Sequence, residues 1–347
     1  MSPGSLVLIP ALLLPAPLPA ALGHGSGLSA AAAASGRPPE CSSGSKRALA
    51  KGPSIWELAR VPTLQQYCDL MARAHAQLPT MPDAARRAAE EAEKALPGHA
   101  APAVVLARAA LATGSIEDAA RAFERARAID ARSVEDPSTM HDLARVLFRT
   151  GKRDEALGVY RSLVPRIDLL GTTDRRVSVL LEAAHVSMAA EGAGGAAPTM
   201  GELARPPRTP PQPARPRLDE AIAYLREARQ RPPSALAGDV LLSLVLALDR
   251  AGAREEADAT LVEAARSGAR LRSGALEYLA APEDRAALDA LAAEGADRAA
   301  AQKGWEAYLA GPGGKGTWAA AARARLDALK KGGPARALKP ARGGKPK

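Results

Sequence analysis

Apolar residues recur at every third or fourth position in a series of segments between about residue 55 and residue 329, with Glu and Arg between them. No segment shows the strict alternation of apolar and polar residues, rich in β-branched side chains, that is typical of a strand. Alanine, leucine, arginine and glutamate dominate these segments and are strong helix formers. The pattern therefore predicts an all-α protein.

A short motif occurs three times within this pattern. A glycine is followed five residues later by an alanine, and after four more by a bulky residue, at Gly114/Ala119/Phe123, Gly151/Ala156/Tyr160 and Gly252/Ala257/Leu261. We expect an apolar helix before each glycine and an amphipathic helix after it; the apolar helices are predicted over 104–112, 143–149 and 241–250. Each unit is thus predicted to be a helix, a glycine-containing turn and a second helix.

Further helix pairs are predicted on both sides of these units, at 63–78 with 83–96, 175–190 with 218–229, and 283–294 with 297–310. Residues 193–217 are rich in Pro and Arg and form an insertion in the second of these pairs. Its P-x-x-P steps leave two interpretations, a docking peptide or a surface loop. We expect a last helix after Thr317, which is its predicted N-cap. This helix is expected to cap the stack, with Trp305, Tyr308 and Trp318 in the core of the cap.

The spacing of these units resembles the tetratricopeptide repeat family, of the exported bacterial type. The residues that carry the resemblance are Ala107, Ala110, Leu143, Ala144 and Leu147 in first helices, Ala119, Phe123, Ala126, Ala156, Tyr160 and Leu163 in second helices, and Pro165 near a helix end. The resemblance implies a right-handed superhelical solenoid over residues 55–192 and 218–329, with a C-terminal capping helix. It also implies that the protein binds other proteins in the concave groove that its first helices line.

The formal net charge of +9 lies mostly in the tail. Residues 330–347 contain seven Lys and Arg and no acidic residue, and we expect them to be disordered, as a solvated tail or as an anchor to an anionic surface. The rest of the chain is almost neutral, and aromatic residues make up only 3% of the sequence. Neither a phosphate-binding face nor a base-stacking surface is indicated, so we expect no nucleic-acid partner.

Residues 6–22 are apolar but contain four prolines, which argues against a membrane-spanning helix. The stretch suits the apolar part of a signal peptide, over residues 1–23, ahead of a disordered linker at 24–54. No Lys or Arg precedes the stretch, and the alternative is a disordered leader. We expect export to the periplasm or cell surface, with a cytoplasmic protein as the alternative.

The sequence contains two cysteines, Cys41 in the linker and Cys68 in the first predicted helix. An isolated pair in an exported protein is expected to form a disulfide. Such a bridge would fix the linker to the first helix and stabilise the fold by about 3–4 kcal/mol in the chain-entropy description. The alternative is a buried free thiol at Cys68 and an inert Cys41.

Motifs for catalysis or metal binding are not found in the sequence. The five histidines are scattered, neither cysteine belongs to a C-x-x-C pair, and no serine lies in a G-x-S-x-G turn. The glycine-rich stretch 311–317 follows a predicted helix where a phosphate-binding loop follows a strand, so we interpret it as a turn. The sequence predicts no catalytic residue, cofactor or metal.

The resemblance places Arg108, His141, Arg145, Phe148 and Arg149 on the groove face of the first helices. Arg145 and Arg149 lie four residues apart, where like charges repel, and an acidic partner would be a reason to place them together. We therefore predict that a protein or peptide binds there through an acidic segment or a C-terminal carboxylate, and the alternative is a solvated helix surface. The predicted function is a non-catalytic scaffold; the alternatives are an enzyme or accessory subunit with an unrecognised site, or a cytoplasmic assembly factor.

The signal-peptide interpretation predicts that the mature protein begins between about residue 21 and residue 30. N-terminal sequencing of protein recovered from the cell envelope tests it. Envelope material that still begins at Met1 would contradict export by this route.

Overall fold

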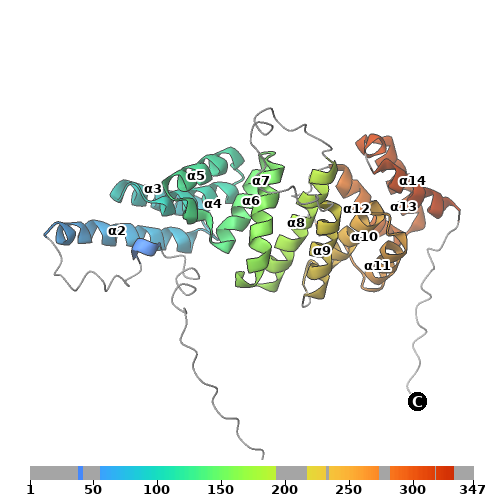
Figure 1. Cartoon of the computed structure of the whole chain (residues 1–347), viewed down its shortest axis with the longest axis horizontal. Coiled ribbons are helices and arrows are strands. Elements are labelled where there is room, and N and C mark those ends of the chain that lie inside the picture. The colour runs from blue at the N-terminus through green and yellow to red at the C-terminus, as the bar shows by residue number, and fades with distance from the viewer. Residues whose placement is uncertain are drawn as a thin grey trace, which may run out of the picture.

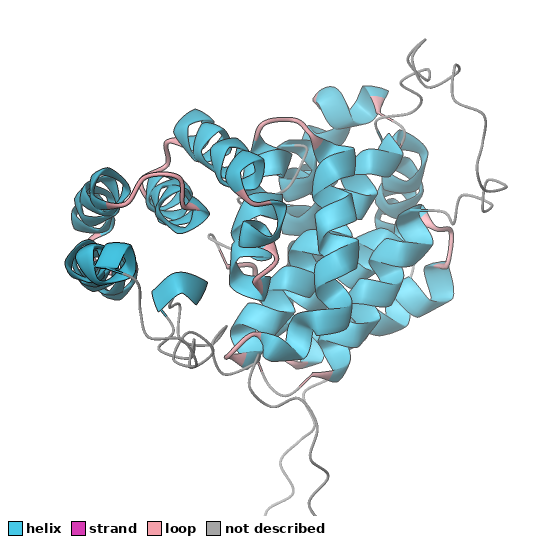
Figure 2. Cartoon of the chain, turned by 60° about the vertical axis from the view of Figure 1, so that its left-hand side comes forward, coloured by secondary structure: helices cyan, strands magenta, loops and turns pink. Residues whose placement is uncertain are grey.

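The computed structural model describes residues 38–41, 55–192, 217–231, 234–272, 282–316 and 318–331. Within these ranges the regular secondary structure is helical throughout, with thirteen α-helices and four short 3-10 helices, and Figure 2 shows only helices and loops there. The predicted signal peptide, most of the linker, the insertion at 193–216, Thr317 and the tail beyond 331 lie outside the described residues. The all-α prediction is confirmed for the part of the chain that is described.

Twelve of the helices pack as six antiparallel hairpins in chain order. The pairs are α2 (Ile55–Gln77) with α3 (Pro82–Ala95), α4 (Ala100–Ala112) with α5 (Ile116–Ile129), α6 (Pro137–Arg149) with α7 (Arg153–Leu163), α8 (Thr173–Gly192) with α9 (Arg217–Gln230), α10 (Ala237–Arg250) with α11 (Arg254–Arg266), and α12 (Pro282–Glu294) with α13 (Arg298–Ala310). A final helix, α14 (Ala319–Lys330), packs against α13. Each predicted helix pair is therefore present, including α8 with α9 on either side of the insertion.

Successive hairpins follow one another along the long axis of the molecule (Figure 1). We call α2, α4, α6, α8, α10 and α12 the first helices and their partners the second helices. First helices contact one another across hairpins, α2 with α4, α4 with α6, α8 with α10 and α10 with α12. The first helices thus form a row that runs through the stack.

Small side chains occupy the points where helices meet, as the motif predicts. Ala119, Ala156, Ala221 and Ala257 are fully buried. The bulky residues Phe123 and Tyr160 are buried as well, and the third bulky position differs: Leu261 is only half-buried and its neighbour Thr260 is buried instead. Alanine has no side-chain entropy to lose and lets helices approach closely, so these positions fix the packing of each hairpin.

The three motif glycines end the first helices in a left-handed conformation. Gly114, Gly151 and Gly252 have φ of 82°, 81° and 77°. At Gly151 the glycine N–H donates to the carbonyl of Phe148 at 3.0 Å, and the next N–H, of Lys152, donates to the carbonyl of Leu147 at 2.9 Å. Both carbonyls would otherwise lack partners at the helix end, so the turn closes the helix and reverses the chain.

The two ends of the stack are held by different contacts. At the N-terminal end a disulfide joins Cys41, in the 3-10 helix η1 (Pro39–Cys41), to Cys68 of α2, as the sequence predicts. Beside it, Tyr67 donates a hydrogen bond to the Glu40 carboxylate at 2.6 Å, and the same carboxylate lies 3.3 Å from Nδ1 of His99. Residues 38–41 are thereby fixed to α2 and to the start of α4.

At the C-terminal end the buried side chain of Arg325 connects α14 to three earlier helices. It pairs with Asp249 of α10, with Asp258 of α11 at 3.3 Å and with Glu294 of α12 at 3.0 Å. Glu294 also accepts a hydrogen bond from the indole of Trp305 at 2.6 Å. The capping helix is therefore attached by the ion pairs of one buried arginine.

Of the three aromatic residues predicted in the core of the cap, two are buried and one is half-buried. Trp305 and Tyr308 are buried, with ring centroids 5.8 Å apart. Trp318 is half-buried, and the guanidinium of Arg250 lies 5.0 Å from the centroid of its ring. The glycine-rich stretch before α14 contains a short 3-10 helix, η5 (Pro312–Lys315), and is a turn as predicted.

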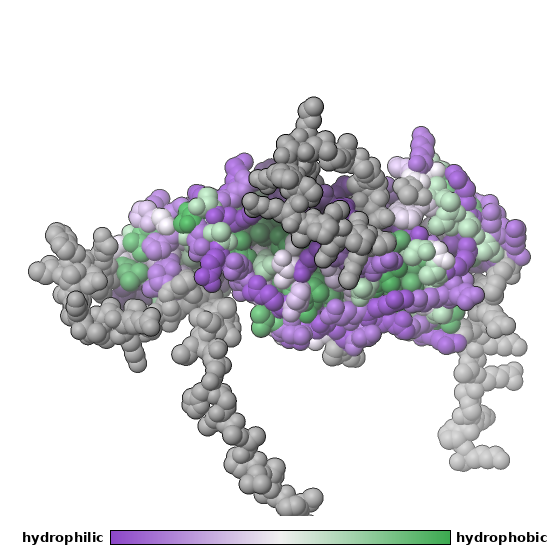
Figure 3. All heavy atoms as spheres, in the orientation of Figure 1, coloured by the Kyte–Doolittle hydropathy of each residue, from purple (hydrophilic) through white to green (hydrophobic). Residues whose placement is uncertain are grey.

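Exposed ion pairs join the second helices and their turns across hairpins. The pairs are Glu93–Arg125, Glu124–Lys152, Asp154–Arg217, Arg161–Glu220, Arg226–Glu256 and Arg229–Glu263. Hydrophilic side chains cover much of the described surface on the face shown in Figure 3. Among the described helices none is long and apolar enough to cross a membrane.

The turn conformation predicts opposite effects for two glycine-to-alanine changes in one hairpin. Gly151→Ala should lower the free energy of unfolding by roughly 1–2 kcal/mol, because an L-residue is strained at a φ of 81°. Gly158→Ala, in the middle of α7 with open space around an added methyl group, should raise it by up to about 1 kcal/mol. Urea unfolding measures both, and stabilisation by Gly151→Ala would contradict the turn.

Candidate functional site

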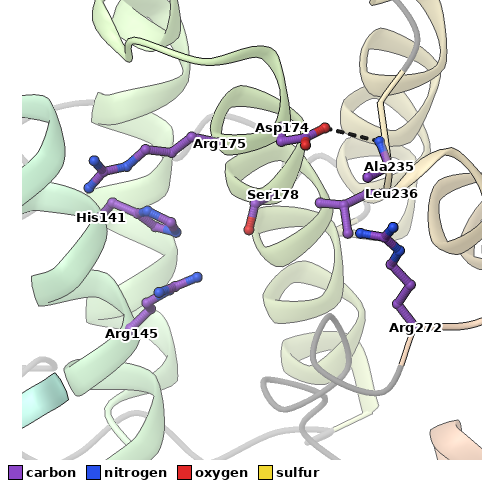
Figure 4. A pocket seen from close by; sticks show the side chains of 8 residues that line it. All are labelled: His141, Arg145, Asp174, Arg175, Ser178, Ala235, Leu236 and Arg272. Carbon is purple, nitrogen blue, oxygen red and sulfur yellow. Dashed lines mark hydrogen bonds between the residues drawn. The ribbon is translucent and has the colours of Figure 1, made fainter. Parts of the chain in front are cut away.

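A pocket of about 420 Å³ opens between two first helices, α6 and α8, and the turn that precedes α10. Its walls are formed by His141, Arg145, Asp174, Arg175, Ser178, Ala235, Leu236 and Arg272. Figure 4 shows Arg175, His141 and Arg145 in sequence along one wall, with Arg272 and Leu236 on the other side. The pocket therefore spans three successive hairpins.

Helix α6 brings His141 and Arg145 to one wall because they lie one helical turn apart. The helix starts at Pro137 after an N-cap at Asp136, whose carboxylate accepts hydrogen bonds from the N–H groups of Ser138 and Thr139 at 3.1 Å. Leu143 and Val146 on its other faces are buried in the main core. The cap fixes where α6 begins, and the buried leucine and valine fix its rotation.

Behind this wall lies the buried carboxylate of Glu182, from the middle of α8. Its Oε2 is 2.8 Å from His141 Nε2, 3.0 Å from Arg145 Nε and 2.8 Å from the hydroxyl of Tyr160. Its Oε1 accepts from Arg145 at 2.5 Å and from the hydroxyl of Ser178 at 2.8 Å. One carboxylate thus joins α6, α7 and α8 through four side chains.

The surroundings keep Glu182 ionised although its side chain is only 3% exposed. Burial by itself would raise the pKa of this carboxyl, but the charge and hydrogen bonds of His141 and Arg145 outweigh it, so the pKa lies far below its ordinary value. A buried carboxylate with that many donors is a fixed negative charge. It determines where the Arg145 guanidinium lies at the edge of the pocket.

The first turns of α8 also border the pocket opening. Asp174 accepts hydrogen bonds from the hydroxyl of Ser234 at 2.5 Å and from the N–H of Ala235 at 3.0 Å, and these bonds lower its pKa. They hold the turn before α10 against α8. The next residue, Arg175, is half-buried and points toward α6 (Figure 4).

Two guanidinium groups of the pocket form no ion pair with any described residue. These are Arg175 at the start of α8 and Arg272 after α11. Arg272 contributes to the low pKa of Asp174 through its charge, and its backbone N–H donates to Asp239 at 2.9 Å. The pocket therefore presents cationic groups from two different hairpins to solvent, an arrangement suited to an anionic ligand.

The structure brings together only two of the five residues predicted to bind a partner. His141 and Arg145 line the pocket. Arg108 lies outside it and pairs with Asp142 of the next first helix at 2.7 Å. Phe148 packs against the main core, and Arg149 is exposed but does not line this pocket.

One premise of the sequence-based prediction is wrong. The repulsion between Arg145 and Arg149, four residues apart, pointed to an acidic partner from outside the chain, but Glu182 of the same chain pairs with Arg145. Arg108 is likewise paired within the chain, with Asp142. Both arginines join successive hairpins, so their location alone does not indicate a partner.

Sequence reasoning missed Asp174, Arg175, Ser178, Glu182 and Arg272 as parts of this site. One signal was available. Glu182 is the only Asp, Glu, Lys or Arg in the otherwise largely apolar stretch 179–188 of a predicted helix. A lone acid in such a stretch is expected to be buried and paired.

No group of three or more His, Cys, Asp and Glu residues among the described ones is placed to hold a metal ion. His185 Nε2 lies 3.1 Å from the hydroxyl of Ser243, but both residues are buried and lie outside the pocket. Burial is the main cause that lowers the pKa of His185 to about 4, so this contact belongs to the core.

No protein-family model matches the chain, and no curated protein is significantly similar to it. Arguments about function therefore rest on the hairpins and on the pocket.

The Glu182 network predicts that two arginines of one pocket differ in their effect on stability. Arg145→Gln should lower the free energy of unfolding by about 3 kcal/mol, which is the low end of the range for removing one partner of a buried ion pair. The low end is expected because His141, Tyr160 and Ser178 still contact Glu182. Arg175→Gln should change it by less than about 0.5 kcal/mol, since no described residue pairs with Arg175. Urea unfolding of both variants measures the difference. Equal changes in the free energy of unfolding would contradict the conclusion that Arg145, and not Arg175, belongs to a buried ion pair.

Proposed function

We propose that this protein is a non-catalytic scaffold of the tetratricopeptide-repeat type, whose hairpins form a superhelical solenoid and which holds an acidic segment of another protein against its first helices. The contact site is the pocket between α6, α8 and the turn before α10. The observation that carries the proposal is the pair of guanidinium groups there, Arg175 and Arg272, that form no ion pair with a described residue.

The position of the pocket supports a macromolecular ligand. Its lining residues come from α6, α8 and the segments that flank α10 and α11, so an extended peptide across the row of first helices would touch several hairpins at once. Guanidinium groups bind carboxylates through paired N–H donors, which gives both attraction and orientation. Leu236 adds an apolar contact on the far wall.

The repeat character supports a scaffold over an isolated binding domain. Hairpins packed in sequence, glycine turns and buried alanines recur from α4 to α11. In helical-repeat proteins each unit contacts only its neighbours, which leaves a long continuous surface for binding. The second part of the proposal, location in the periplasm or at the cell surface, is supported by the Cys41–Cys68 disulfide, since such bonds persist mainly in oxidising compartments.

Charge reversal at the pocket tests the proposal. The full-length protein and an Arg175→Glu/Arg272→Glu variant are used to capture partners from an extract of the source organism. We expect a protein that the wild type retains and the variant loses, with binding weakened by added salt because the contacts are partly exposed. A peptide from the acidic segment of that protein should then bind the wild type directly.

A matched control removes the effect of net charge. Arg87→Glu/Arg266→Glu makes the same change in charge at exposed positions on α3 and α11, away from the pocket. It should retain the partner as the wild type does. If the pocket variant and the control capture the same proteins, the pocket is not the contact site.

A further inference from the structure

Three contacts between successive first helices share one register. These contacts are Arg108–Asp142, Arg145–Glu182 and His185–Ser243. On both α6 and α8 the residue that bonds to the next first helix lies three positions after the one that bonds to the previous first helix, so the two lie on one face. The first two contacts are ion pairs, whereas the third joins an imidazole to a hydroxyl. The interface between α8 and α10 therefore has no acidic residue at the position that carries one on α6 and on α8.

The imidazole of His185 has a hydrogen-bond partner on one side only. Its Nε2 lies 3.1 Å from the hydroxyl of Ser243, whereas its Nδ1 is buried and has no hydrogen-bond partner among the described residues. A neutral imidazole has one N–H group, which the hydroxyl can accept while Nδ1 stays unprotonated. A second proton would make Nδ1 a buried donor without an acceptor and would place a charge in the core. The geometry therefore favours the neutral imidazole.

The charged groups that act on His185 are already bonded to other side chains. They are Asp284 of α12, Arg250 of α10 and Glu182 of its own helix. Arg250 and Asp284 pair with each other. Glu182 is engaged by His141, Arg145, Tyr160 and Ser178. The described side chains that α7 and α9 bury are apolar apart from that tyrosine, so they add no charge that would compensate a proton on His185.

From this arrangement we propose that the interface between α8 and α10 is acid-sensitive, and that a proton taken up by His185 separates helices α10 to α14 from the rest of the stack. In a helical-repeat protein the stability is approximately the sum of the units and of the interfaces between neighbours. A loss at one interface therefore acts first at that interface. This inference goes beyond the proposed function and does not depend on it.

Opening of this interface would take the pocket apart. One wall comes from α6 and α8, whereas Leu236 and Arg272 on the other side come from the segments that flank α10 and α11 (Figure 4). The bonds of Asp174 to Ser234 and Ala235 at the pocket opening are exposed, so water can replace them. A ligand that spans the pocket would therefore be released at acidic pH.

Acid should weaken the interface because His185 binds a proton more readily once it is exposed to water. Burial is the main cause that lowers its pKa from the ordinary value of 6.5 to about 4 in the folded protein. The stability that depends on the neutral imidazole is fully present above pH 6.5 and is lost as the pH falls toward 4. Between pH 7.5 and pH 5 this group should lower the folding equilibrium constant by about 30-fold.

The test compares urea unfolding of the full-length protein and of His185→Gln at pH 7.5 and pH 5. The ratio of the folding equilibrium constants at the two pH values should be about 30-fold larger for the wild type than for the variant. Ser243→Asp places an acid beside the imidazole, as in the two neighbouring contacts, and should also reduce the ratio. His141→Gln is the matched control, since this buried histidine already contacts an acid, and it should leave the ratio undiminished.

Hydrogen exchange followed by mass spectrometry at pH 5 locates the opening along the chain. Peptides from α8 and α10 should exchange about tenfold faster in the wild type than in His185→Gln. Peptides from α4, which lies two hairpins before α8, should exchange at the same rate in both proteins.

Two results would overturn the proposal. A folded His185→Gln variant with the wild-type ratio would show that this histidine does not control the acid response. Acceleration in α4 equal to that in α10 would show that the whole stack unfolds and not one interface. If neither His185→Gln nor Ser243→Asp folds, the wild type decides: exchange in α8 and α10, relative to α4 and corrected for the intrinsic rates, must increase from pH 7.5 to pH 5. None of these measurements uses a ligand, so their outcome leaves the acidic-partner proposal untouched.

Discussion

The packing of this protein depends on alanine at the points where its helices meet. Alanine is fully buried at equivalent positions of the second helices from α3 to α11, among them Ala85, Ala119, Ala156, Ala221 and Ala257. A side chain that ends at Cβ buries little apolar area, so the stability of each contact comes from close approach of two backbones. Polar groups caught between helices that pack so closely lose water and need partners from the protein.

The first helices meet this requirement with contacts from one hairpin to the next. Arg108 reaches Asp142, Arg145 and His141 reach Glu182, His185 reaches Ser243, and Arg250 reaches Asp284. Arg108 and Arg145 hold equivalent places in their units, six residues before the turn glycine, and each pairs with an acid on the following first helix. The pocket lies where Arg175 of this row and Arg272, which follows α11, place guanidinium groups that form no ion pair with a described acid.

The helices and turns could be predicted from sequence because their causes are local. Gly151 marks a helix end by its freedom at positive φ, and the apolar period marks the face that is buried. The candidate site could not be predicted in the same way. His141 and Glu182 are 41 positions apart in sequence, and Arg325 and Asp249 are 76 apart. No pattern within a short stretch of sequence therefore indicates that these residues contact each other. The register of the repeats placed Arg108 and Arg145 on one face of the first helices. It did not indicate that the next hairpin supplies the acidic residues with which they pair.

The two rows of helices give the stack unequal resistance to bending. The second helices are joined by exposed ion pairs such as Arg226–Glu256, each worth about 0–1 kcal/mol and weakened by salt. The first helices are joined by buried or half-buried contacts, and breaking a buried ion pair costs roughly 3–5 kcal/mol. Separating the second helices should therefore cost less free energy than separating the first helices, so bending of the stack should open the side of the second helices.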